Sequence, residues 1–177
     1  PFIRFWVIFF RKWTKFIQLN WLFLIPLVLV GVLFYCINRF TPYVWICGIP
    51  VIILFPFWGG LTYVLRNYAR EEHAFVWGDF KDAAKENAGK LLINGAITYV
   101  LLLNVSYAIQ FYSYVLRENQ DNWFFYIPLA LSITLAALFL FAQYYIPLMV
   151  VTFDLKLKQI YKNAFIFAIM GLWRNIL

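Results

Sequence analysis

Long uncharged stretches alternate with short charged ones along this chain. Four stretches contain no Asp, Glu, Lys, Arg or His: Trp21–Ile37, Val44–Leu65, Leu91–Leu116 and Trp123–Phe153. The shortest has 17 residues, about 25 Å of α-helix, which just spans the hydrocarbon core of a bilayer. The longest has 31 residues and must tilt, protrude, or bend at Pro128 or Pro147. The pattern predicts an all-α, polytopic helical membrane protein with four complete spans in two hairpins, residues 21–65 and 91–153.

The second of these spans carries helix breakers. Pro50 and Pro56 lie inside Val44–Leu65, so we expect a kinked helix. The pair Gly59–Gly60 follows, and small residues of this kind let a neighbouring helix approach closely.

Residues 1–20 alternate basic and aromatic positions at helical spacing. Arg4, Arg11 and Lys15 fall on one face, and Lys12 lies nearby. This pattern predicts an interfacial amphipathic helix whose cations contact anionic lipid. The alternative is an ordinary first span, in which Arg11 and Lys12 would each cost about 2.5–3.5 kcal/mol at the centre.

The last stretch, 154–177, begins with a basic loop. We expect an interfacial helix over 156–173, because Ala164–Trp173 is apolar but too short to span a bilayer. A fifth span would begin near Ile176 and be truncated.

Composition and charge distribution set the class and the orientation. Hydrophobic residues make up 64% of the chain and charged residues 13%, against about 25% charged in soluble domains. The net charge of +7 therefore points to membrane topology and anionic lipid rather than to nucleic acid. Thirteen Lys and Arg lie in 1–20, 66–90 and 154–174, against two in the turns between. The positive-inside rule then predicts a multi-pass plasma-membrane protein with a cytoplasmic N-terminus.

The connection 66–90 holds ten charged residues, five of each sign. Its charge balance favours a docking surface or an internal salt-bridge network over a lipid-binding patch. The second span is expected to continue to about Glu72, followed by a turn over 75–78 and a helix with Asp79 as N-cap. We hypothesise that Arg66 or Arg70 bridges to Asp79 or Asp154; the alternative is that these groups are all solvated. The candidate interaction cluster is Arg66, Arg70, Glu71, Glu72, His73, Trp77, Asp79, Phe80 and Asp154.

Catalytic chemistry finds little support in the residue pattern. His73 beside Glu71 and Glu72 lacks the convergent ligands that a zinc site needs. Cys36 and Cys47 are close enough in sequence for a disulfide, but two buried free thiols are the favoured interpretation. Polar residues inside the spans are expected to form interhelical hydrogen bonds. We expect no catalytic, cofactor or metal site, and no enzyme activity.

Several strings resemble a known family: PFIRF, LNWLFLIPL, PFWGGLTYVLRNYAREEHAFVWGDFKDAAKENAGK and QYYIPLMVVTFDLKLKQIYKNAF. They resemble the YesL-like family of bacterial membrane proteins, a domain of unknown function. The resemblance implies a small polytopic protein of the plasma membrane of Gram-positive bacteria, encoded near carbohydrate-uptake genes. It favours an accessory or interaction subunit whose partner is a sugar transporter or membrane sensor. The alternative is a transporter, since IYKNAFIFAIMGLWRNIL faintly resembles the coupling loop of ABC permeases.

Overall fold

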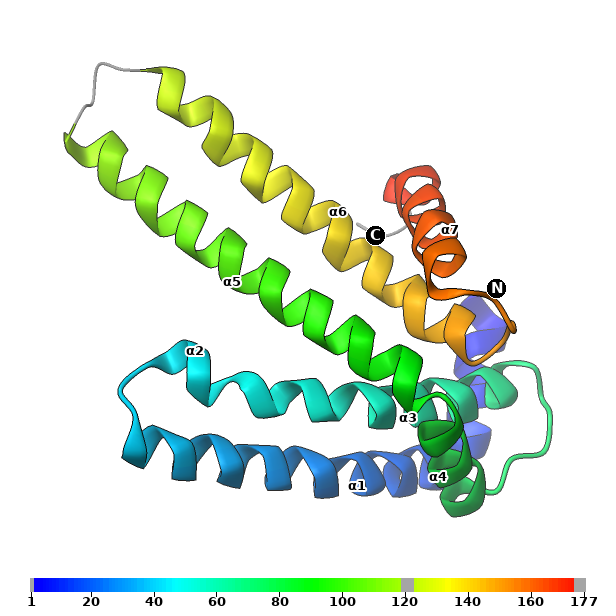
Figure 1. The fold of residues 1–177 in the computed structure, drawn as a ribbon. Coiled ribbons are helices and arrows are strands. Elements are labelled where there is room, and N and C mark those ends of the chain that lie inside the picture. Colours follow the sequence, from blue (N-terminus) through cyan, green and yellow to red (C-terminus); the bar gives the residue numbers. More distant parts are fainter. Residues whose placement is uncertain (1, 119–122, 174–177) are drawn as a thin grey trace. The chain divides into compact units, whose positions relative to one another are not determined.

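The computed structural model describes residues 2–118 and 123–173, with side chains from residue 6 onward. All regular elements in these ranges are helical (Figure 1). They are α1 (Phe2–Phe40), α2 (Val44–Cys47), η1 (Ile49–Ile53), α3 (Leu54–Ala69), α4 (Val76–Glu86), α5 (Ala88–Glu118), η2 (Trp123–Phe125), α6 (Tyr126–Val150) and α7 (Leu157–Met170). The side chain of Arg4 and the predicted start of a fifth span near Ile176 lie outside the described residues.

Four helical stretches in the described ranges are long and apolar enough to cross a membrane. They are Trp6–Phe40, Val44–Ala69, Ala88–Glu118 and Trp123–Val150. The predicted class, an all-helical polytopic membrane protein, is confirmed. The chain divides into two compact units: unit 1 comprises residues 1–95 and 147–155, and unit 2 comprises 96–146 and 156–177.

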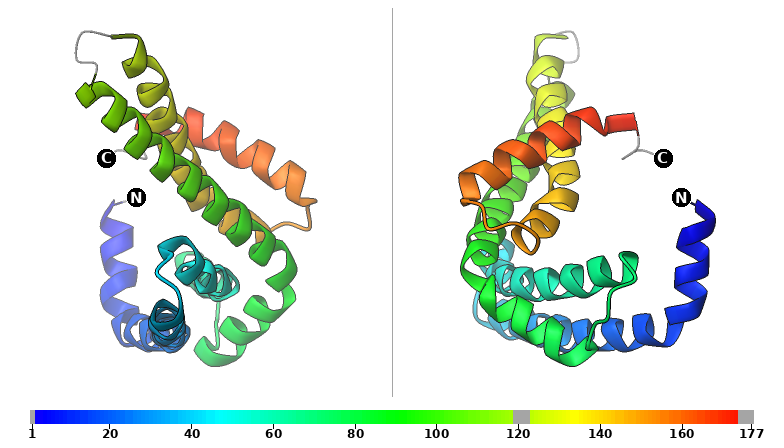
Figure 2. Two further views of the ribbon diagram at one scale, coloured as in Figure 1. Left: turned by 60° about the vertical axis from the view of Figure 1, so that its left-hand side comes forward. Right: turned by 90° about the vertical axis from the view of Figure 1, so that its right-hand side faces the viewer.

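In unit 1, α1 bends at Lys12. The backbone there leaves helical geometry, with φ −115° and ψ 15°, and the first turns point away from the rest of α1 (Figure 2). We expected the break near residue 20, eight residues later. Phe16 and Leu19 pack into a core cluster with Val64 and Tyr68 of α3, and this packing keeps 13–20 in the same helix as the span.

The second span is kinked as predicted, because α2, η1 and α3 follow one another with a 3₁₀ stretch between the α-helices. Pro56 lies in the first turn of α3, where a missing N–H leaves no helical hydrogen bond unmade. The glycine pair allows the expected close approach: a Cβ on Gly60 would collide with the carbonyl oxygen of Phe80, and one on Gly59 with Leu91.

Unit 2 contains most of the α5–α6 hairpin, residues 96–146, and α7. Three buried residues of α7 recur every four positions, Ile160, Ala164 and Ala168, and form one helix face. Aromatic pairs join α7 to α6, with ring centroids 6.2 Å apart for Phe139–Phe165 and 5.9 Å for Tyr145–Phe167. The long uncharged run therefore does not form one helix: it divides into η2, the 25 residues of α6, and a turn after Val150.

Candidate functional site

Arg66, in the last turn of α3, makes several polar contacts within unit 1. Its Nη1 donates to the carbonyl oxygen of Val151 at 2.8 Å and to Oγ1 of Thr152 at 3.3 Å. Its Nε and Nη2 donate to Oδ1 of Asn67 at 3.1 and 2.8 Å. The guanidinium also lies 4.5 Å from the ring centroid of Tyr63. Arg66 thereby links the first hairpin to the segment that follows α6.

The predicted ion pairs of this region are wrong in their partners. No described carboxylate lies within ion-pairing distance of Arg66. Arg70 is 4.0 Å from Glu72, and both side chains are more than half exposed. Asp154 pairs instead with Lys90, at 3.2 Å. The physical reason lies at the end of α6, where the last carbonyls have no helical donor and so attract the guanidinium.

Beside Arg66, Tyr68 fills the core of unit 1. It is 1% exposed and packs with Leu19, Val64 and Phe80. Phe16 meets its ring edge-on, with centroids 5.6 Å apart. Its hydroxyl has no hydrogen-bond partner among the described residues. We did not predict a role for Tyr68, although the spacing of Val64 and Tyr68 continues the buried face of α3 by one turn.

Two of the predicted lipid-contacting cations turn toward the connection 66–90. Arg11 Nη2 lies 3.1 Å from Oε2 of Glu71, and Lys12 Nζ lies 4.7 Å from the ring centroid of Tyr68. Lys15 is exposed. Glu71 has a positive φ of 62°, which turns the chain sharply after α3. The bend of α1 and the turn after α3 therefore meet through a charged pair.

The helix after this turn begins earlier than predicted. We expected a turn over 75–78 with Asp79 as N-cap; instead α4 starts at Val76, with Phe75 in the N-cap position. Asp79 lies in the first turn, and its Oδ2 accepts a hydrogen bond from the backbone N–H of Phe75 at 3.0 Å. A carboxylate here satisfies a free donor and faces the positive end of the helix dipole.

The remaining candidate residues of the connection divide into buried and exposed. Phe80 is 6% exposed and belongs to the core cluster of Tyr68. Phe75 and Trp77 are 70% and 63% exposed. His73 is exposed too, and its ring packs on Phe75 with centroids 4.6 Å apart. Across the described ranges, no three His, Cys, Asp or Glu side chains gather where a metal ion could bind.

Cys36 and Cys47 are free thiols, as we favoured, but the expectation that both are buried is wrong for Cys36. Cys36 is exposed, whereas Cys47 is buried and its Sγ lies 3.7 Å from both Oδ1 of Asn38 and the carbonyl oxygen of Thr41.

Several polar residues of the spans behave differently from the prediction of interhelical hydrogen bonds. Asn104, Ser106, Ser132 and Thr134 each donate, at 2.8 Å, to the carbonyl four residues earlier in their own helix. This bond requires no partner helix, because the acceptor is always within reach. Others are buried and not accounted for in this way: Asn94, Thr98 and Gln143.

Comparison with known proteins identifies a family. A family model described as "Protein of unknown function, DUF624" matches residues 16–107. No curated protein and no solved structure gives a significant match. The matched range includes α1 from residue 16 onward, α3 with Arg66 and Tyr68, the connection, α4 and the first part of α5. Because the match covers more than half of its residues, the chain belongs to DUF624, a family of proteins of unknown function.

Proposed function

We propose that this chain is an accessory subunit of the plasma membrane that docks on another membrane protein and catalyses no reaction itself. The observation that supports it is the exposure of Phe75 and Trp77 on a connection that is anchored at both ends. Arg66 holds the end of α3, and Asp79 holds the start of α4. Exposed aromatics on a fixed support are typical of protein-binding surfaces.

A sugar transporter or a membrane sensor is the proposed partner class. This partner class comes from the resemblance to the YesL-like family, which is a more specific assignment than the match to DUF624. The test is a pull-down of the full chain from membranes in mild detergent. Phe75→Ser with Trp77→Ser should release the partner, whereas Trp123→Ser with Phe124→Ser should retain it. The control pair is equally apolar, and its members are 71% and 62% exposed. Equal recovery with both double variants, or no enriched membrane protein with the wild type, contradicts the docking proposal.

The proposed topology places the N-terminus, 66–90 and 154–174 in the cytoplasm. It is supported by the charge distribution and by the four helices of spanning length. The measurement is labelling of single cysteines in a chain whose Cys36 and Cys47 are replaced by Ser. A cysteine at the exposed Tyr43 position should react in intact cells, and one at the His73 position should react only after permeabilisation. The reverse pattern would overturn the orientation.

The alternative function, a transporter, predicts a hydrated path through the spans. Unit 2 does contain a cavity of about 290 Å³ between α5 and α6. Its polar members are Asn104 and Ser132, and each bonds to its own helix, while its other members are aliphatic or aromatic. Such a lining supports the accessory role. Substrate uptake into vesicles containing only this chain would favour the transporter instead.

A further inference from the structure

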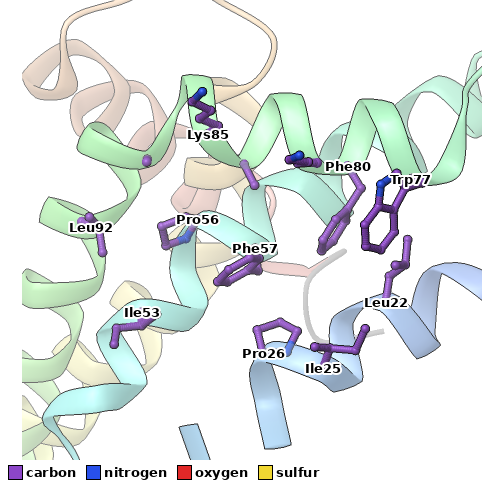
Figure 3. Close-up of a pocket in the computed structure, with 13 residues that line it drawn as sticks. Leu22, Ile25, Pro26, Ile53, Pro56, Phe57, Trp77, Phe80, Lys85 and Leu92 are labelled. Atoms are coloured by element: carbon purple, nitrogen blue, oxygen red, sulfur yellow. The ribbon is translucent and has the colours of Figure 1, made fainter. Parts of the chain in front are cut away.

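An apolar cavity lies beneath α4 in unit 1 (Figure 3). Its volume is about 580 Å³, within the roughly 300–1,000 Å³ typical of small-molecule sites. Leu22, Ile25 and Pro26 of α1 lie at one side, and Pro56 and Phe57 of α3 at another. A second cavity of about 470 Å³ shares Leu22, Ile25 and Trp77 with the first. Together they form one groove, which we call the α1–α4 groove.

The helix above this groove has the geometry of a membrane-surface helix. Where α1 and α3 are seen end-on, α4 runs across the hairpin rather than along it (Figure 2). Its buried residues Phe80, Ala83 and Ala84 form one face, while Lys81 and Lys85 are exposed. If the hairpin crosses the bilayer, α4 lies near the headgroups with its apolar face inward. The exposed Trp77 fits the same depth, because Trp is enriched at the membrane boundary.

Two lysines are the charged members of the groove wall. Lys81 and Lys85 are four residues apart on α4, so they lie on one side of the helix. Among the described residues, neither has a hydrogen-bond or ion-pair partner. The other cations of the connection all have one: Arg66, Arg70 and Lys90. Asp82 and Glu86 follow the lysines in sequence, but neither lines the groove.

We infer that the α1–α4 groove binds one anionic phospholipid. An acyl chain occupies the apolar groove, and the phosphate of the headgroup lies between Lys81 and Lys85. The apolar lining accepts a hydrocarbon chain but offers nothing to a polar metabolite. The two unpaired lysines select a negative headgroup, while their methylene stems extend the apolar wall. This inference rests on the proposed membrane residence; the groove shares Trp77 with the proposed docking surface, but the variants that test the groove leave Phe75 and Trp77 unchanged.

The headgroup contact is tested with the purified full chain in a neutral detergent. Phosphatidylglycerol or phosphatidylcholine with the same acyl chains is added, and bound lipid is counted by native mass spectrometry. The wild type should retain phosphatidylglycerol more than phosphatidylcholine. Lys81→Gln with Lys85→Gln should lower phosphatidylglycerol affinity by roughly 25-fold, because each lysine near an anionic headgroup contributes about a fivefold preference and the two factors multiply. Lys158→Gln with Lys162→Gln is the matched control: these exposed lysines of α7 have the same spacing and the same loss of charge.

The acyl-chain contact needs a second pair of variants. Ile25→Trp places a larger side chain in the groove at a position that is 62% exposed, so the fold should tolerate it. Leu27→Trp is the control, on the same helix, 44% exposed and outside the groove. Ile25→Trp should lower the binding of both lipids, and Leu27→Trp should change neither.

Three results would overturn the inference. The first is equal retention of the two lipids by the wild type. The second is an equal loss with the two double-lysine variants, which would reduce the effect to net charge. The third is a failure of Ile25→Trp to lower lipid binding. Loss of a co-purified protein, and not of lipid, in that variant counts as the same result, because it would make a protein helix the occupant of the groove. A failed pull-down of a protein partner leaves all three readouts intact, so the two proposals fail separately.

Discussion

The two units of this chain use polar side chains differently. In unit 1, Arg66 reaches the carbonyl of Val151 across 85 positions of sequence, and Lys90 reaches Asp154 across 64. In unit 2, Asn104 and Ser132 return to the carbonyl four residues earlier. A bond to the same helix stabilises no tertiary contact. Arg66 and Lys90 of unit 1 therefore hold segments together, whereas Asn104 and Ser132 of unit 2 only make their own helix compatible with an apolar surrounding.

Burial follows the same division. In the most apolar part of Val44–Ala69, 39% of residues are buried, against 6% for Trp123–Val150. The family match covers residues 16–107. It therefore includes nearly all residues of unit 1 between the bend of α1 at Lys12 and residue 95. The comparison predicts that a substitution is costly where a polar side chain or a glycine of unit 1 contacts another segment, and mild where a polar side chain bonds only to its own helix.

The largest effect is expected at Arg66. Arg66→Met keeps an unbranched apolar stem but leaves the Val151 carbonyl and the buried Asn67 amide oxygen without their donor. Because hydrogen bonds from a charged group contribute about 1.5–3 kcal/mol, the free energy of unfolding should fall by about 2–3 kcal/mol. The measurement is an unfolding titration in mixed micelles followed by circular dichroism.

Arg70→Met is the control for Arg66→Met. Arg70 is exposed and its contact with Glu72 is long, so this variant should unfold like the wild type. Equal destabilisation by the two substitutions would mean that general charge near the headgroups, not the link to Val151, stabilises unit 1.

A smaller loss is expected at Gly60. In Gly60→Ala the new methyl group meets the backbone oxygen of Phe80, which cannot move without shifting α4. Overpacking of this kind costs about 1–3 kcal/mol. Gly31→Ala, with open space around its Cβ, should be neutral or slightly stabilising. The melting temperatures of the two variants in detergent give the comparison, and a stable Gly60→Ala protein would show that α3 and α4 are not held closely.

Much of the fold could be predicted because its cause is local. Uncharged runs of sufficient length give the spans, Pro50 gives the kink of the second span, and Gly59–Gly60 gives a site of close approach. The boundary of α1 is different in kind. Nothing within residues 1–20 shows that Phe16 and Leu19 pack on α3. The sequence therefore predicts a break near residue 20, whereas the helix bends at Lys12.

The candidate site was predicted in its location but not in its contacts. The charged connection identifies Arg66, yet its charge pattern suggests carboxylates as the partners of this side chain. The acceptor is a backbone carbonyl, and every residue has one, so only the three-dimensional position of Val151 distinguishes it. The own-helix bonds of Ser132 and Thr134 could have been expected, since hydroxyls in helices commonly bond to the carbonyl four residues earlier.

A third effect is expected at Asp79, where unit 1 uses a local bond. Asp79→Ala removes the acceptor for the Phe75 N–H and should cost about 1 kcal/mol, as the loss of helix caps typically does. Asp79→Asn keeps an acceptor oxygen and should recover most of the stability. Asp82→Ala, at an exposed position of the same helix, is the matched control. If Asp79→Asn is as unstable as Asp79→Ala, the charge rather than the hydrogen bond stabilises the start of α4.

The smallest effect is expected in unit 2, and it sharpens the comparison most. Ser132→Ala removes a hydroxyl that donates to the carbonyl of Pro128 in the same helix. That carbonyl belongs to the first turn of α6 and keeps its helical bond, and alanine has the higher helix propensity, so the two changes nearly cancel. The free energy of unfolding should change by less than about 0.5 kcal/mol. Thr62→Ala makes the same change in unit 1, where Thr62 donates to the carbonyl of Trp58. It should be equally mild, because what distinguishes unit 1 is the reach of its polar bonds and not their presence. A loss above about 1 kcal/mol for Ser132→Ala alone would mean that its hydroxyl supports the packing of α6 on α5, and the contrast between the two units would then be wrong.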